Sequence, residues 1–294
     1  MMSPESRSPR TVSVCIPTYR GATHIRAAVD SVLAQTFTDF ELLIVDDNSP
    51  DDTFAIASSY RDARVRCLRN PRNLGPQDNW NRCLAEAKGR YFKLLPQDDV
   101  LAPSCLQREV EVLETDERQQ IALVFCARTI VDARSRPVLV RQPFGRKGRR
   151  LTADAIFRRC LRRGTNVIGE PGGVLFRRAL VDTVGPFDAA FGYVVDLDYW
   201  LRLLAHGDGY YIPEALVSFR VSRGAWSVAI GADQAAAFNG LTAKIVKQGR
   251  LRAGPLDLAI GRTLAPLNNA LRLFLYRFLF REDDSRDHQT GLRP

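Results

Sequence analysis

The sequence predicts an α/β fold in which a mainly parallel sheet is flanked by helices and followed by a helical C-terminal extension. Three observations lead to this prediction. Short apolar runs alternate with helical patterns through the first hundred residues, polar clusters follow several of these runs, and the pattern after about residue 230 is helical to the end. The chain has 294 residues, of which 45% are hydrophobic and 26% charged. It is therefore long enough and apolar enough to bury a large core.

The first half contains four strand-like runs. Each is short, apolar and bounded by polar or turn-forming residues, and they lie at 12–16, 40–45, 65–68 and 91–95. Helical patterns separate them, and the first of these repeats its apolar residues from Ile25 to Leu33 at the spacing of one helix face. A second helix is expected after Pro50 and a third at 75–88, with Gly89 just past its end as a C-cap.

Polar clusters follow three of these four runs. Thr18 and Tyr19 come after the first, Asp46 and Asp47 after the second, and Asp98 with Asp99 after the fourth. The carboxyl ends of parallel strands meet at one edge of a sheet, and the ligands of such sheets bind beyond that edge. The sequence therefore predicts that the three clusters converge on one crevice.

The second half of the chain is less regular. It shows a helix near 103–117, a strand near 121–126, a glycine-rich piece at 169–173 and an amphipathic helix at 195–206. The predicted organisation is a short disordered tail at 1–10, one domain at 11–225 and a helical extension at 226–294. Within the domain, we expect a nucleotide-sugar half at 11–103 and an acceptor and catalytic half at 104–225.

The cysteine pattern and the absence of a long apolar segment indicate the cellular compartment. None of the six cysteines forms a CxxC pair, so a disulfide framework or a zinc site is not expected. The first ten residues hold no apolar leader, and no run of about 18 apolar residues occurs. These features predict a cytoplasmic protein.

Almost the whole net charge of +9 lies in the segment 141–163. It carries nine basic side chains against the single acid Asp154. The basic residues are Arg141, Arg146, Lys147, Arg149, Arg150, Arg158, Arg159, Arg162 and Arg163. An anionic partner, such as a phosphate or a lipid headgroup, and a solvated mobile loop are both open interpretations. A second class of function follows, a protein that binds nucleic acid or an anionic membrane, but only Phe144 and Phe157 could stack on bases, so no nucleic acid is expected.

The adjacent acids Asp98 and Asp99 are the most informative pair. Two carboxylates at a buried strand end repel each other and lose hydration, so they need a cation or hydrogen-bond donors. Mg²⁺ or Mn²⁺ bridging to a diphosphate would supply that cation, since both prefer oxygen ligands. The alternative is that Asp99 caps the next helix. Asp46 and Asp47 carry the same ambiguity, because aspartates also favour turns.

Together, three stretches resemble the family-2 inverting glycosyltransferases of GT-A fold, a Rossmann-like fold, over roughly residues 11–225. They are VSVCIPTYRGATHIRAAVDSVLAQTFTDFELLIVDDNSPDDT at 12–53, NPRNLGPQDNWNRCLAEAKGRYFKLLPQDDVLAP at 70–103 and VGPFDAAFGYVVDLDYWLRLLAHG at 184–207. The resemblance implies transfer of a sugar from a UDP- or dTDP-linked donor to an acceptor hydroxyl, in the assembly of a cell-surface glycan or glycolipid. It also implies Mg²⁺ or Mn²⁺ as cofactor and a glycan or lipid-linked acceptor as partner.

The resemblance also implies a role for individual residues. Those expected to line the nucleotide are Pro17, Thr18, Tyr19, Asp47, which accepts from the ring N–H of the base, and Asp98, which faces the ribose. Asp99 would bind the metal and Asp196 would take the proton of the acceptor hydroxyl. The residues expected around the donor and acceptor sugars are Gly172, Gly173, Arg220 and Arg223.

The sequence departs from the family pattern at three positions. Gln97 stands where an acid often opens the metal motif, Val195 where a glutamate often precedes the base, and Ser222 where a histidine often follows the last strand. Arg220 or Arg223 is expected to contact the diphosphate in place of that histidine.

The helix at 195–206 contains two aspartates, Asp196 and Asp198. They are two positions apart and hence about 200° apart around the axis, so both cannot face one crevice. Asp196 is expected to be the base, held in its ionised form by the helix N-terminus. Asp198 is expected to be solvated or to pair with Arg202.

A leucine- and phenylalanine-rich helix is predicted at 267–281. Its apolar arc consists of Leu267, Leu271, Phe274, Leu275, Phe278 and Leu279, and arginines interrupt it. Such a helix does not cross a bilayer comfortably. Docking against the protein body, docking against a second subunit in a homodimer and lying on the inner face of a membrane are the three open interpretations.

Overall fold

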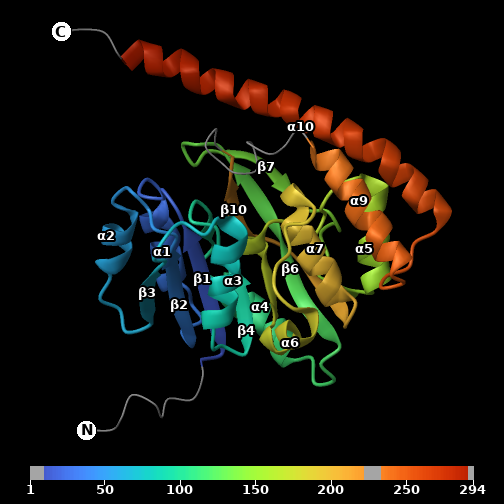
Figure 1. Ribbon diagram of the computed structural model, residues 1–294, viewed down its shortest axis with the longest axis horizontal. Coiled ribbons are helices and arrows are strands. Elements are labelled where there is room, and N and C mark those ends of the chain that lie inside the picture. Colours follow the sequence, from blue (N-terminus) through green and yellow to red (C-terminus); the bar gives the residue numbers. More distant parts are fainter. Residues whose placement is uncertain (1–9, 222–232, 291–294) are drawn as a thin grey trace.

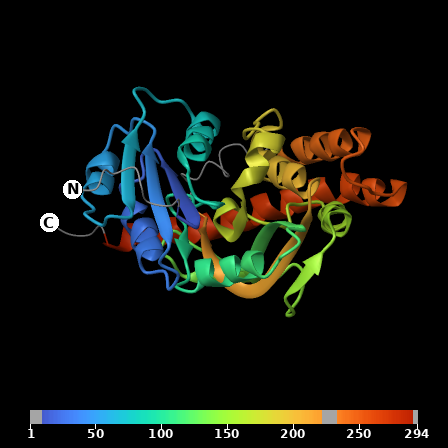
Figure 2. The same ribbon diagram turned by 90° about the horizontal axis from the view of Figure 1, so that it is seen from below.

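The computed structural model describes residues 10–221 and 233–290, without the side chains of Tyr193 and of 275–290. It shows one ten-stranded sheet with helices on both faces and two helices appended at the C-terminal end (Figure 1). The view from below shows α1 and α4 on one side of the sheet and α3, α7 and α9 on the other (Figure 2). The α/β fold class predicted from the sequence is confirmed.

The strands follow one path through the sheet, in the order β3-β2-β1-β4-β9-β6-β10-β5, with β7 beside β6 and β8 beside β10. Their bounds are β1 Val12–Thr18, β2 Phe40–Asp46, β3 Val65–Arg69, β4 Tyr91–Leu94, β5 Val100–Leu101, β6 Ile121–Val131, β7 Pro137–Arg141, β8 Arg149–Leu151, β9 Val174–Arg177 and β10 Asp208–Arg220.

The helices lie between and after these strands. Their bounds are α1 Ile25–Leu33, α2 Thr53–Ser58, α3 Pro76–Glu86, α4 Cys105–Glu114, α5 Ala153–Arg163, α6 Val181–Val184, α7 Val195–Leu204, α9 Gln234–Lys247 and α10 Pro255–Thr290. Three short 3₁₀ turns are η2 Pro171–Gly173, η3 Arg178–Leu180 and η4 Gly192–Val194.

The N-terminal half is the predicted parallel sheet. β1 pairs in parallel with β2 and with β4, and β2 pairs in parallel with β3. All seven residues of β1 are buried, as expected for a central strand covered on both faces. The carboxyl ends of β1, β2 and β4 consequently lie together at one edge.

The second half is mixed rather than parallel. β9 runs antiparallel between β4 and β6, whereas β6 and β10 are parallel to each other. β9 thereby joins the two halves into one continuous sheet. The helix-and-strand alternation of the first half could predict its parallel order, but the second half has no such alternation, so its strand directions come from tertiary pairing.

Two apolar clusters form the core, one on each face of the sheet. The helices α1 and α4 cover one face with Val29 and Val110, and α3, α5, α7 and α9 cover the other with Leu84, Phe157 and Trp200. Alternate strand residues feed the two clusters: Val14 of β1 belongs to the first and Cys15 to the second.

Gly89 does not have the predicted role of a helix cap. The helix α3 ends at Glu86, and its C-cap Ala87 is extended, not left-handed. A Cβ atom at Gly89 would lie 2.4 Å from the backbone nitrogen of Ser13. Glycine is required here because the chain passes close to β1 on entering β4.

The C-terminal helices pack on the second half of the domain. α10 contacts α5 and α9, and Ala265 of α10 is buried at this contact. Farther along α10, Asn268 donates to the carbonyl of Arg163, and Leu271 lines the pocket described below. One side of this stretch therefore docks against the protein body, one of the three predicted alternatives, whereas Leu267, Leu271 and Phe274 are more than half exposed. Leu275, Phe278 and Leu279 lie outside the described side chains. No helix among the described residues is long and apolar enough to cross a membrane.

Candidate active site

The predicted convergence of polar clusters occurs at the carboxyl ends of β1, β2 and β4. The backbone nitrogen of Asp47 donates to the carbonyl of Thr18 at 2.8 Å. Gln97 joins the third cluster to the first, since its amide accepts from the Tyr19 nitrogen at 2.9 Å and donates to the Tyr19 carbonyl at 3.0 Å. Thr18 donates its hydroxyl proton to the same Gln97 oxygen. The residue that replaces an acid of the family pattern therefore fixes the backbone of this edge.

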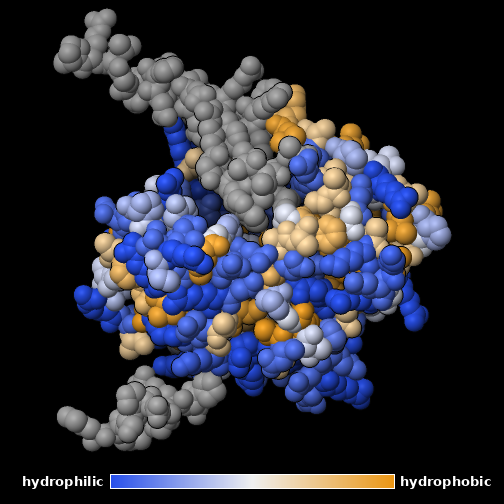
Figure 3. Space-filling view, viewed as in Figure 1, coloured by the Kyte–Doolittle hydropathy of each residue, from blue (hydrophilic) through white to orange (hydrophobic). Residues whose placement is uncertain are grey.

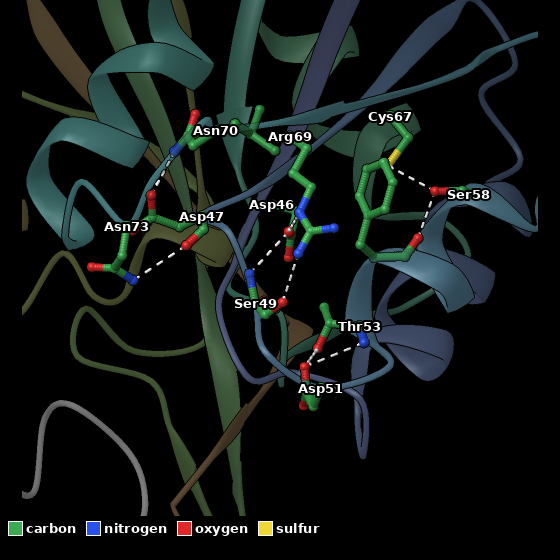
Figure 4. Close-up of polar contacts among 12 residues, drawn as sticks. Asp46, Asp47, Ser49, Asp51, Thr53, Ser58, Cys67, Arg69, Asn70 and Asn73 are labelled. Carbon is green, nitrogen blue, oxygen red and sulfur yellow. Dashed lines mark hydrogen bonds and ion pairs between the residues drawn. The ribbon is translucent and has the colours of Figure 1, made fainter.

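Asp47 is buried and holds the loop that follows β3. Its Oδ1 accepts from Nδ2 of Asn70 at 2.6 Å and from the Leu74 nitrogen at 2.8 Å, and its Oδ2 accepts from the Gly75 nitrogen at 2.9 Å. Figure 4 shows Asp47 between Asn70 and Asn73, and the amide of Asn73 donates to its carbonyl. A carboxylate offers about four acceptor positions, so these three hydrogen bonds leave one of them unused among the described residues.

Asp46 is a turn residue. Its Oδ2 accepts from the Ser49 nitrogen at 3.0 Å and lies 3.3 Å from Nε of Arg69 (Figure 4). The two adjacent acids thus differ: Asp46 closes the turn after β2, and Asp47 binds the neighbouring loop.

Asp99 is fully buried at the end of β4. Its Oδ1 accepts from the backbone nitrogen of Arg220 at 3.0 Å, and its Oδ2 has no hydrogen-bond partner among the described residues. Burial, reinforced by the nearby Asp98, raises the pKa of Asp99 well above its ordinary value. Ser104, not Asp99, is the N-cap residue of α4, so the alternative that Asp99 caps this helix is wrong.

This donor set fits a divalent cation held largely by substrate. The unpartnered Oδ2 of Asp99 is a hard oxygen ligand with nothing to satisfy it, and Asp98 lies next to it. Among the described residues, no three His, Cys, Asp or Glu side chains are grouped as a metal site. Mg²⁺ in phosphate-transfer sites commonly takes one or two carboxylates and completes its shell with water and substrate phosphates.

Arg220 lines the pocket described below, as expected for a residue of the donor and acceptor region, and its contact with a diphosphate stays a prediction. Its guanidinium group is buried and donates to the carbonyls of Asp98, Asp132 and Ala133 and to Oγ of Ser135. Four of its five N–H groups are therefore used to tie β10 to the turn after β6. Arg223 and Ser222 lie outside the described residues.

Gly172 and Gly173 differ from the prediction. Both are buried in the turn η2 and do not line the pocket described below. A Cβ atom at Gly172 would lie 3.1 Å from Leu95 and Val217 and 3.6 Å from Oδ2 of Asp99. These glycines therefore allow η2 to pack on the strands above Asp99, and the pocket contacts come from Glu170 and Pro171.

A pocket of about 420 Å³ joins the two halves of the site. Asp98 lies in its wall on the side of the β4 carboxyl end, and Asp196 lies in its wall on the side of α7. Arg128 and Glu170, which form an ion pair, also contribute to it. Most of the remaining wall is apolar and comes from β6, β7, β10, α9 and α10, including Ile130, Val138, Leu139, Phe219, Phe238 and Leu271.

Asp196 is partly buried in the first turn of α7. Its Oδ2 accepts from Nδ2 of Asn166 at 3.0 Å, and its Oδ1 from the Leu197 nitrogen at 2.7 Å. Burial raises the pKa of Asp196 to about 7, although these two hydrogen bonds oppose the shift. The expectation that the helix N-terminus keeps this carboxylate ionised is therefore wrong, because desolvation outweighs the helix amide. A pKa near 7 suits a group that must accept a proton at neutral pH.

Asp198 takes the second of its two predicted roles. It is buried, and its Oδ2 lies 2.7 Å from Nε of Arg202 at the i+4 position. Arg202 also donates to the carbonyls of Val184 and Pro186. Asp198 therefore holds the loop before α7 and does not line the pocket.

The basic segment 141–163 forms no single patch. It consists of the end of β7, a turn, β8 and α5, so the alternative of an unstructured loop is wrong. Arg150 pairs with Asp208, and Arg162 pairs with Asp257. Arg141 alone of its basic residues lines the pocket.

Three further residues of the site were not predicted from the sequence. Asn166 orients Asp196, and Arg128 pairs with Glu170 beside it. Arg128 interrupts an otherwise apolar run in β6, and a charged residue in such a run indicates a buried partner. Asn166 has no comparable signal, since asparagine is common in loops.

Comparisons with known proteins agree with this geometry. Residues 13–185, more than half of the chain, match the family described as Glycosyl transferase family 2. An uncharacterized protein of Mycobacterium tuberculosis is 32% identical over 70% of this chain and 65% of its own length. An Escherichia coli UDP-Glc:alpha-D-GlcNAc-diphosphoundecaprenol beta-1,3-glucosyltransferase is 35% identical over 36% of this chain and 42% of its own length. The chain matches slightly less than two thirds of the length of the first such relatives.

Two solved structures share the fold at 18% sequence identity. Staphylococcus aureus TarS 1-349 in complex with UDP-GlcNAc superposes with a TM-score of 0.67, covering 88% of this chain and 72% of that one. A mannosyltransferase from Pyrobaculum calidifontis in complex with GDP-Man and Mn²⁺ superposes with a TM-score of 0.63, covering 95% and 76%. These likenesses establish a GT-A fold. On the match to the family, the chain is a member of glycosyl transferase family 2.

Proposed function

We propose that the protein transfers a sugar, with inversion, from a UDP- or dTDP-linked donor to a hydroxyl of a lipid-linked acceptor in cell-surface glycan or glycolipid assembly. One observation carries this proposal. Asp98, at the nucleotide edge, and Asp196, at the start of α7, line the same pocket. A donor held near Asp98 would present its sugar to an acceptor held near Asp196.

Asp196 supplies the general base. The acceptor oxygen bonds to the anomeric carbon on the face opposite the diphosphate, and the bond from that carbon to the diphosphate breaks with its electron pair. The hydroxyl proton passes to the Asp196 carboxylate. With a pKa of about 7, this carboxylate is a stronger base than an ordinary aspartate, and about half of it is ionised and able to accept a proton near pH 7.

The nucleotide edge holds the donor. Pro17, Thr18 and the exposed Tyr19 present the end of β1 to the base, and Asp47 keeps one acceptor position for a ring N–H. Asp99, with Asp98 beside it, would hold Mg²⁺ or Mn²⁺, which when bound neutralises the diphosphate leaving group. Uracil and thymine present the same ring N–H, so both donor types satisfy this site.

The pocket wall favours an acceptor with an apolar part. Asp98, Asp196, Arg128 and Glu170 are polar, whereas the wall from β7 and α10 is largely apolar. A free sugar would leave that apolar wall uncovered. The E. coli relative named above acts on a diphosphoundecaprenol-linked sugar. An acceptor of the same class has a polar part and an apolar part, as the wall of this pocket does.

The test is a transfer assay with Mn²⁺, UDP-glucose, UDP-GlcNAc or dTDP-glucose, and GlcNAc-diphospho-lipid as acceptor. Release of the nucleoside diphosphate and the anomeric configuration of the product, measured by NMR, are the readouts. We expect acceptor-dependent release and an inverted linkage with at least one donor. A retained configuration would overturn the mechanism, and exclusive use of GDP-mannose would overturn the donor assignment.

A further inference from the structure

The exposed hydrophobic side chains of the described residues are concentrated in two places. Seven of the nine large ones lie on β7 and on residues 267–274 of α10. On β7 they are Val138, Leu139 and Val140, and on α10 they are Leu267, Leu271, Leu273 and Phe274, with exposed fractions between 36% and 63%. Scattered apolar side chains are normal on a protein surface, but a gathering of this kind marks an interaction site.

The apolar side chains of α10 form a stripe. Leu267, Leu271 and Phe274 are spaced i, i+4 and i+7 and so share one face of the helix. The earlier part of α10 buries Asp257, Gly261 and Ala265 against the domain, at similar spacing. Beyond Ala265 one side of the helix stays on the domain, since Asn268 donates to the carbonyl of Arg163 and Asn269 and Arg272 line the pocket. Its apolar residues Leu267, Leu271 and Phe274 are between 54% and 63% exposed.

β7 is an apolar strand at the edge of the sheet. Among the described strands it pairs with β6 alone, and all five of its residues are exposed, so the side chains on both of its faces meet solvent. An exposed apolar edge strand invites association, and proteins usually protect it with charge, proline or a covering element. Here Pro137 and Arg141 bracket the strand, but Val138, Leu139 and Val140 between them stay uncovered.

β7 and α10 both contribute apolar side chains to the wall of one pocket. Val138 and Leu139 of β7 and Leu271 of α10 all line the pocket that holds Asp196. β7 lies beneath α10 along the upper side of the molecule in Figure 1, and hydrophobic side chains follow α10 in the same view in Figure 3. Together, β7 and the stripe on α10 form what we call the β7–α10 face: Val138, Leu139, Val140, Leu267, Leu271 and Phe274.

The surroundings of this face are basic. Between residues 133 and 151, on both sides of β7, the chain carries seven basic residues and no acid: Arg134, Arg136, Arg141, Arg146, Lys147, Arg149 and Arg150. Arg262 and Arg272 are the charged residues of 258–274 in α10. Arg136 pairs with Asp132 and Arg150 with Asp208, whereas Arg141 and Arg272 line the pocket beside the apolar residues. Apolar side chains next to an excess of positive charge match an anionic lipid surface, because its acyl region takes up the apolar side chains and its headgroups attract the basic ones.

We propose that the β7–α10 face binds an anionic phospholipid bilayer and places the mouth of the pocket on the membrane. A second copy of the chain is a poorer occupant, because a two-fold interface brings each patch against itself. Positive charge around β7 would then face positive charge, which disfavours association. The proposed binding of the β7–α10 face to a bilayer does not depend on the proposed transfer reaction. Only its consequence, that a lipid-linked acceptor enters the pocket without leaving the bilayer, rests on that function.

The test is flotation with vesicles of phosphatidylcholine alone and of phosphatidylcholine with phosphatidylglycerol. We expect the whole chain to bind the anionic vesicles and to be released by high salt. The triple variant Val140→Gln, Leu267→Gln, Phe274→Gln changes exposed residues that do not line the pocket, and it should lose about tenfold or more of the binding. Leu256→Gln is the matched control, since Leu256 lies on α10, is 70% exposed and is away from the pocket.

The remaining outcomes separate the alternatives. Equal binding of the triple variant and the control, or no binding to anionic vesicles by the wild-type chain, would overturn the proposal. A dimer in light scattering that the triple variant abolishes, without vesicle binding, would assign the face to a second copy instead. Asp196→Asn should bind vesicles like the wild-type chain, so a failure of the catalytic assignment and a failure of the membrane surface are distinguishable.

Discussion

The Nδ2 atom of Asn166 lies 3.0 Å from Oδ2 of Asp196 and also donates to the carbonyl of Gly169. The side-chain oxygen of Asn166 accepts from the nitrogens of Ile168 and Gly169. A loop that is itself tied down therefore positions the proposed base. The hydrogen bond also lowers the pKa of Asp196 against the larger effect of burial.

Asp196→Asn should lower kcat by roughly two to four orders of magnitude, the usual contribution of a general base. Donor affinity should be unchanged, since the nucleotide edge is formed by other strands. Asp198→Asn is the control: it weakens the pair with Arg202 and should cost about 1–3 kcal/mol of stability with a far smaller loss of kcat. Kinetics and donor binding of both folded variants are the measurements. A nearly active Asp196→Asn beside an inactive Asp198→Asn would reverse the assignment.

Asn166→Ala should lower kcat about tenfold, the loss expected for one hydrogen bond of 1–1.5 kcal/mol. It should also move the rising limb of the kcat–pH profile to higher pH, because Asp196 loses a donor that favours its ionised form. Asn81→Ala is the matched control: Asn81 holds Phe187 by two similar hydrogen bonds and does not line the pocket. An unmoved pH profile in Asn166→Ala would reduce Asn166 to a structural residue.

The stability of the protein should depend on pH through Asp196. Its folded pKa of about 7 exceeds the value of about 3.9 in an unfolded chain, so the folded state binds the extra proton. The penalty for ionising the folded carboxylate therefore grows from about pH 4 to 7 and is complete above pH 7. Asp196→Asn should consequently melt at a higher temperature than the wild type at about pH 8 and at a similar temperature below about pH 4. Asp182→Asn, an exposed site, should show no such difference. Equal melting curves at pH 8 would contradict a buried, destabilised base.

Asp99 should control metal-assisted donor binding. In the presence of UDP, adding Mn²⁺ should raise the melting temperature of the wild-type chain above its value with UDP alone. At a Mn²⁺ concentration a hundredfold above its Kd, the added free energy of stabilisation should be about 3 kcal/mol. Asp99→Asn should abolish that increment, because its unpartnered Oδ2 is the proposed ligand. Glu117→Gln, at an exposed acid, should keep it. A persistent Mn²⁺ effect in Asp99→Asn would place the metal elsewhere.

Lys93 should position the turn η2. Its buried ammonium lies 2.9 Å from Glu109 and donates to the carbonyl of Gly172 at 2.7 Å. Lys93→Met should cost about 3–5 kcal/mol, because it leaves the Glu109 carboxylate buried without a partner. The double variant Lys93→Met, Glu109→Leu should recover much of that stability in urea unfolding. Its kcat should remain low, since Gly172 still lacks its donor, and full activity of the double variant would argue against the role.

The sequence by itself determined the parallel N-terminal half and the edge on which its polar residues meet. The strands β1 to β4 are short apolar runs separated by helices, and this spacing leaves few topologies. The carboxyl-end rule then brought Thr18, Asp47 and Asp99 together without any knowledge of side-chain positions. The resemblance to the family added Asp196, whose place in the wall of the pocket the structure shows.

Only the tertiary structure decided how each polar group is used. Arg220 and Gly172 belong to the right region, yet their contacts are with the turn after β6 and with the strands, since neighbours distant in the sequence fill their hydrogen-bonding and packing positions. The pKa of Asp196 likewise depends on burial, which no helix position predicts. The apolar face of α10 was visible in the sequence, but packing decides how much of it the domain covers: Leu267, Leu271 and Phe274 are more than half exposed, although Asn268 still contacts Arg163. Local patterns determine elements, whereas desolvation and long-range contacts determine the state of each group.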